Sequence, residues 1–151
     1  MAYGTVAGVL ARIPGLRANA ISTPDTDQIG VWLAQGAACI DRKLGAGGYG
    51  VPVGISAAVY PELVALNEVY AAAHALRARG LDTVTGTGET RSEIWLREFN
   101  AQLADLAQAD LTGSGVLQVT VTGVRPQRIR SLQLRRIDGY SRRAYPAEPA
   151  E

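Results

Sequence analysis

Few side chains in this sequence belong to the types that do chemistry, and they stand apart from one another. His74 is the only histidine and Cys39 the only cysteine among 151 residues. A protein zinc site needs several ligands, and a nucleophile needs a base within hydrogen-bonding reach. Neither residue has such a companion, so we interpret His74 as a hydrogen-bonded position at the margin of the core and Cys39 as a small hydrophobe. A single cysteine also excludes an internal disulfide, and fits a reducing compartment.

Two further patterns could suggest chemistry, and both have plainer explanations. The glycine-rich stretch at 45–50 (GAGGYG) resembles a phosphate-binding loop, but it follows a predicted helix, lacks a Lys-Ser/Thr pair and opens no helix. We read it as a helix stop and a connector. The acidic residues are predicted on solvated helix faces, away from any apolar pocket that could pair two carboxylates. The sequence therefore predicts no catalytic residue, no metal site and no cofactor, and a protein that is not an enzyme.

The arginines near the end of the chain predict a contact. Residues 125–151 hold seven arginines and three acidic residues, whereas residues 1–124 hold 8 Lys+Arg and 11 Asp+Glu. Apolar residues alternate with these arginines, which would be a liability in a purely solvated tail. We expect this contact arm to meet phosphates or an acidic protein surface, without sequence-specific reading of nucleic acid. Its residues are Arg125, Arg128, Ile129, Arg130, Leu132, Leu134, Arg135, Arg136, Ile137, Arg142 and Arg143.

Four segments with helical periodicity precede the arm. Thr5 caps a short helix that Pro14 stops, and Thr23 caps a helix over about 24–44. A third helix starts at Pro61 and ends before Gly80, and the fourth covers about 89–110. The fold class predicted is mainly α, a small helical bundle of one short and three long helices, with a C-terminal extension that contains a β-strand or hairpin. The domains are 1–111, the helical body, and 112–151, the strand and the basic arm.

The predicted subunit interface lies on two of these helices. Val31, Ala34 and Ala38 occupy the side of the second helix opposite its apolar stripe, where small and apolar residues are unusual unless something covers them. Ile94 points away from the apolar stripe of the fourth helix. We interpret Val31, Ala34, Ala38 and Ile94 as subunit contacts.

After Gly115 the period changes from helical to alternating. Residues 116–124 alternate apolar and polar side chains, which is typical of a half-buried strand. A strand must pair its backbone groups with another segment or another chain. Residues 128–137 are one candidate, although their pattern also permits a helix. Residues 140–151 are expected to become ordered only on a partner.

The composition fits a soluble domain with a real core, since 47% of the residues are hydrophobic. No apolar run approaches the length of about 18 residues that a membrane span needs, and no secretion signal is expected at the N-terminus.

The order of motifs along residues 1–110 resembles one known family. Met1-Ala2-Tyr3 is followed by Ile13-Pro14-Gly15-Leu16, by a helix through Ile40-Asp41, by residues 49–53 (YGVPV), and by an alanine-rich helix and a helix with Trp95. This order is similar to that of the head-tail connector (adaptor) proteins of tailed bacteriophages and gene transfer agents.

The resemblance implies a structural function without catalytic residues. Members of that family form a ring, typically of twelve subunits, which docks beneath the portal protein and receives the stopper or tail. It therefore implies a virion neck protein, made in the host bacterial cytoplasm, whose ring surrounds the DNA channel and whose arm contacts the portal or DNA. The alternative that the residues leave open is a small nucleic-acid-binding regulatory protein that uses the basic arm.

Overall fold

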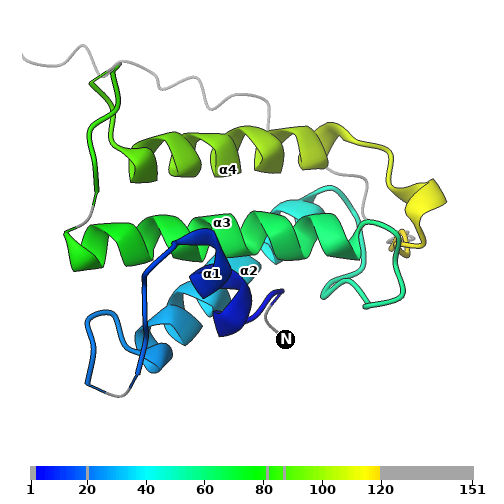
Figure 1. Cartoon of the computed structure of the whole chain (residues 1–151). Helices are drawn as coiled ribbons and strands as arrows, with labels where there is room; N and C mark the ends of the chain where they lie inside the picture. Colours follow the sequence, from blue (N-terminus) through cyan, green and yellow to red (C-terminus); the bar gives the residue numbers. More distant parts are fainter. Residues whose placement is uncertain (1–2, 20, 81, 87, 120–151) are drawn as a thin grey trace, which may run out of the picture. The chain divides into compact units, whose positions relative to one another are not determined.

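Four helices make up most of the described structure (Figure 1). The computed structural model describes residues 3–19, 21–80, 82–86 and 88–119. Within them the chain is mainly helical, as predicted, with one short helix and three long ones. They are α1 (Val6–Arg12), α2 (Thr26–Ala46), α3 (Tyr60–Arg79) and α4 (Arg91–Gln108), and a 3₁₀ turn (Thr112–Ser114) follows them.

The helix starts agree with the predicted caps at one place and differ at another. Thr5 caps α1 and its hydroxyl accepts from the Gly8 N–H at 3.0 Å, as predicted. The predicted cap of α2, Thr23, is wrong, because the cap is Asp25. The Asp25 carboxylate accepts from the Gln28 N–H at 2.6 Å, and the Gln28 side chain accepts from the Asp25 N–H, which closes a capping box.

Helices α2 and α3 each pack against all three of the other helices, and the two most extensive helix contacts are those of α3 with α4 and with α2. In Figure 1 α4 lies alongside α3. A helix covered on several sides buries more than one stripe, and α3 buries alanines all along its second half together with two polar residues. These are Asn67, Glu68, Ala71, Ala72, Ala73 and Ala75. The expectation that the acidic residues are solvated is therefore wrong for Glu68.

The other apolar faces differ in how completely they are covered. The predicted stripe of α2 is buried at Ile29, Leu33 and Ile40. The stripe of α4 is buried only at Phe99, and its remaining apolar residues, Trp95 and Leu106 among them, are half-buried. Helix α4 therefore lies on the body with part of its apolar face still accessible.

The segment after α4 belongs to the helical core. Leu111 and Val116 are buried in the same cluster as residues of α2 and α3. Gln118 forms an antiparallel bridge with Tyr49, and the Gly50 N–H donates to the Leu117 carbonyl at 2.6 Å. The described start of the predicted strand thus pairs with the glycine-rich loop. The sequence analysis did not predict this pairing. The described residues contain isolated bridges of this kind and no longer strand.

Candidate functional site

Three motifs far apart in the sequence meet at the side chain of Tyr3. The Tyr3 hydroxyl donates to the Asp41 carboxylate of α2 at 2.5 Å and accepts from the Val53 N–H at 2.9 Å. Tyr3 is 2% exposed, and its aromatic ring packs edge-on against that of Tyr60. Burial, and then the hydrogen bond to Asp41, raise the pKa of Tyr3 above its usual value. We call this arrangement of Tyr3, Asp41 and Val53 the motif junction.

Buried polar residues of α3 hold the N-terminal segment in place beside the junction. The Asn67 amide nitrogen donates to the carbonyls of Tyr3 and Leu33, the latter at 2.9 Å. The Glu68 carboxylate accepts from the Thr5 N–H and pairs with Arg12 at 3.4 Å. Asn67 and Glu68 therefore tie α3 to residues that precede them by more than thirty positions in the sequence.

The predicted interface residues fall on two separate helices. Val31, Ala34 and Ala38 are all exposed along one side of α2, and Val31 is 54% exposed. Val31 also lines a shallow hollow of about 410 Å³, together with Trp32 and Asp27. Ile94, the predicted contact on α4, is half-buried.

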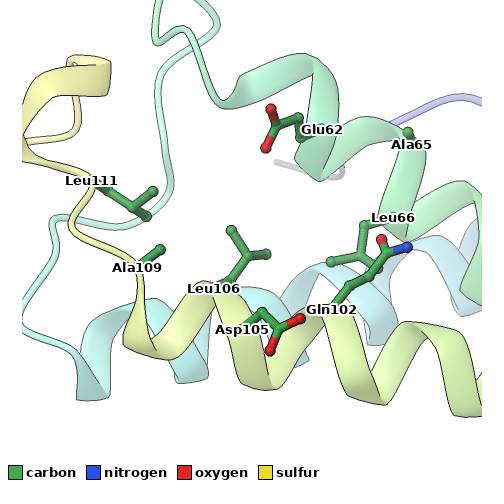
Figure 2. A pocket seen from close by; sticks show the side chains of 8 residues that line it. All are labelled: Glu62, Ala65, Leu66, Gln102, Asp105, Leu106, Ala109 and Leu111. Atoms are coloured by element: carbon green, nitrogen blue, oxygen red, sulfur yellow. The ribbon is translucent and has the colours of Figure 1, made fainter.

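A groove between α3 and α4 has no counterpart among the sequence predictions. Its volume is about 460 Å³. Figure 2 shows the side chains of Leu106 and Leu111 pointing into it, with Glu62 and Asp105 on its two sides. The complete lining is Glu62, Ala65, Leu66, Gln102, Asp105, Leu106, Ala109 and Leu111.

Exposed apolar side chains lie at the pairing of residues 48–50 with 117–119. Leu117 is 80% exposed and Val119 is 53% exposed, and Val51, next to the pairing in the sequence, is 42% exposed; Ile55, four residues further along, is 73% exposed. The Val119 N–H donates to the Gly48 carbonyl at 2.8 Å, so this end of the body is ordered by backbone hydrogen bonds while its apolar side chains face solvent. Such a patch is typical of a contact with another molecule.

The residues that were candidates for chemistry have packing roles. His74 stacks on Trp32 with ring centroids 5.9 Å apart and packs against Tyr70 at 4.6 Å. Burial, and then the positive charge of Arg77, lower the pKa of His74 below its usual value. Cys39 is half-buried against the core. Across the described residues, no group of three or more His, Cys, Asp and Glu side chains lies close enough to hold a metal ion. The helices described there are also too short or too polar to cross a membrane.

The contact arm lies outside the described residues, as do all eleven of its predicted contact positions. Comparison with known protein families, with characterised proteins and with solved structures finds no match to this chain.

Proposed function

We propose that this protein is a structural subunit of a virion neck, a ring-forming head-tail connector that joins the portal protein to the stopper or tail around the DNA channel. The observation that supports this proposal is the motif junction. Tyr3, Asp41 and Val53 belong to three different motifs that carry the resemblance to connector proteins. Their direct hydrogen bonding means that the motifs form one structural unit, which gives their order along the chain a physical reason.

The ring contact is proposed on the exposed side of α2, with Val31, Ala34 and Ala38 as its centre and Ile94 as a contribution from α4. Sedimentation velocity of the full-length protein tests whether a ring forms. A ring would support the connector proposal, and the following variant tests the interface. Ala34→Arg places a charge in the interface, which costs several kcal/mol of association free energy if the charge is buried unpaired. We expect the variant to stay folded and to sediment as a monomer.

Ala104→Arg is the matched control, because Ala104 is also an exposed helical alanine but lies on α4. It should assemble like the wild type. Assembly of Ala34→Arg into the wild-type ring would contradict the interface, and so would an unfolded monomer. A wild-type chain that stays monomeric at high concentration would contradict the connector itself.

The remaining partners are the portal protein on one side and the stopper or tail-completion protein on the other, with DNA passing through a ring of about twelve subunits, as the resemblance implies. The C-terminal extension, residues 112–151, is proposed to include a strand or hairpin and the contact arm. Deletion of residues 125–151 should abolish attachment to purified portal while the far-UV circular dichroism keeps its helical signal. Normal attachment of the truncated chain to the portal would show that the arm is not needed for the portal contact.

The second candidate function is nucleic-acid binding, which the seven arginines of residues 125–151 favour. In that case the isolated chain should retard any duplex DNA. The logarithm of its affinity should fall with the logarithm of salt concentration, with a slope of about −0.9 for each phosphate contact. A ring that forms without retarding DNA distinguishes the connector from this alternative.

A further inference from the structure

The groove between α3 and α4 carries negative charge that nothing in the described structure compensates. Glu62 and Asp105 are both exposed on its sides, and neither side chain makes a hydrogen bond or an ion pair within the described residues. No lysine or arginine lines the groove. The last turn of α4 also contains no basic residue, so the negative end of its helix dipole adds to the charge of Asp105.

The floor of the groove is apolar. Leu66 and Leu111 form it with Leu106, which remains half-buried, and the alanines at 65 and 109 leave room beside them. An acidic margin around an apolar floor fits a segment in which arginines alternate with isoleucine or leucine. Guanidinium groups form strong paired hydrogen bonds with carboxylates, and the aliphatic side chains can cover the exposed part of Leu106.

We propose that this groove receives residues 125–137 of a second copy of the chain when portal and DNA are absent. The segment 125–137 (RPQRIRSLQLRRI) has five arginines, four aliphatic residues and no acidic residue, which complements the groove in charge and in polarity. A contact between an arm and a groove joins two different surfaces, and such heterologous contacts form a ring when the rotation between neighbouring copies closes. The inference rests on the proposed ring only for the presence of neighbouring copies.

Mixed single-cysteine chains test the docking. Both chains carry Cys39→Ala; one carries Ala65→Cys in the groove and the other Gln133→Cys in the arm. After mild oxidation at low ionic strength, a disulfide-linked heterodimer should form. Adding Asp105→Arg to the groove chain should lower its yield at least about tenfold, because an ion pair becomes a repulsion. Glu89→Arg, the same charge change beyond the opposite end of α4, should leave the yield within about threefold.

Two further measurements keep the test decisive. Asp105→Arg puts a positive charge at the negative end of α4, so it should not destabilise the body, and thermal unfolding checks this. Arg128→Glu with Arg130→Glu in the arm chain should restore the heterodimer with the Asp105→Arg groove chain. Restoration supports the proposal, whereas a yield insensitive to Asp105→Arg overturns it, as does failure of the charge swap to restore the yield.

Sedimentation of the unmodified chain separates this inference from the connector function. A ring without the cross-link would remove the arm from the groove and leave the connector proposal standing. The cross-link without a ring would support docking of the arm in the groove and contradict the connector proposal. If a single chain bearing both cysteines closes an intramolecular disulfide at high dilution and the mixed chains form none, a second copy is not the occupant.

Discussion

Two glycines of α2 should respond in opposite ways to the same substitution. Gly30 and Gly36 both lie inside the helix, where glycine destabilises by about 0.5 to 1 kcal/mol relative to alanine. A Cβ added at Gly30 meets nothing within 4 Å. Gly30→Ala should therefore increase the free energy of unfolding by about 0.5 to 1 kcal/mol.

Gly36 faces α3. A Cβ there would lie 2.8 Å from Cδ1 of Tyr70 and still nearer to Oδ1 of Asn67. Asn67 is held by hydrogen bonds to two carbonyls, and Tyr70 is packed against Phe99 with ring centroids 4.8 Å apart, so neither can retreat freely. Overpacking costs about 1 to 3 kcal/mol, and strained amide hydrogen bonds add about 1 to 3.

After the gain in helix propensity, Gly36→Ala should lower the free energy of unfolding by about 1 to 5 kcal/mol. Urea unfolding followed by circular dichroism measures both variants, and an unchanged m-value shows that the shift in midpoint reports stability. The reasoning is refuted if the two variants shift in the same direction by similar amounts, because the helix would then sense only the propensity and not the contact with α3.

Two other predictions concern the aromatic rings of Tyr3 and His74. Tyr3→Phe should cost about 2 to 4 kcal/mol in urea unfolding, because the Val53 N–H and the Asp41 carboxylate both lose a partner, while Tyr60→Phe should cost under about 1; equal losses would contradict the junction. Because the folded pKa of Tyr3 is raised from 10.0, its contribution is complete below pH 10 and is lost as the pH rises above that value, so alkaline destabilisation should be shallower in Tyr3→Phe. The folded pKa of His74 is lowered from 6.5, so its contribution is present above pH 6.5 and is lost as the pH falls through the folded pKa. Proton NMR should show His74 titrating below 6.5, and an acid limb of stability unchanged in His74→Phe would contradict this.

The periodicity of the sequence determined the helices. The cap at Thr5, the apolar stripe of α2 and its end at the glycine-rich segment, where Gly47 is the C-cap, are features that local sequence can specify. The cap of α2 was misplaced because Thr23 and Asp25 are both good caps. The capping box selects Asp25, because Gln28 stands three residues after Asp25 and closes it.

The surfaces required the tertiary structure. The two sides of the groove come from residues 62–66 and 102–111, which no local pattern connects. The same holds for the pairing of Gln118 with Tyr49 and for the burial of Glu68, whose partner Arg12 lies on another helix. Composition did identify the charged arm, because net charge needs no geometry.

The two glycines of α2 illustrate the division between sequence and structure. In the sequence, Gly30 and Gly36 are equivalent helical glycines, and propensity treats them alike. Only the packing of α3 on α2 places Asn67 and Tyr70 against one of them. Local interactions therefore determined which segments form helices, whereas contacts between distant segments decided which helical positions tolerate change and where the acidic groove lies.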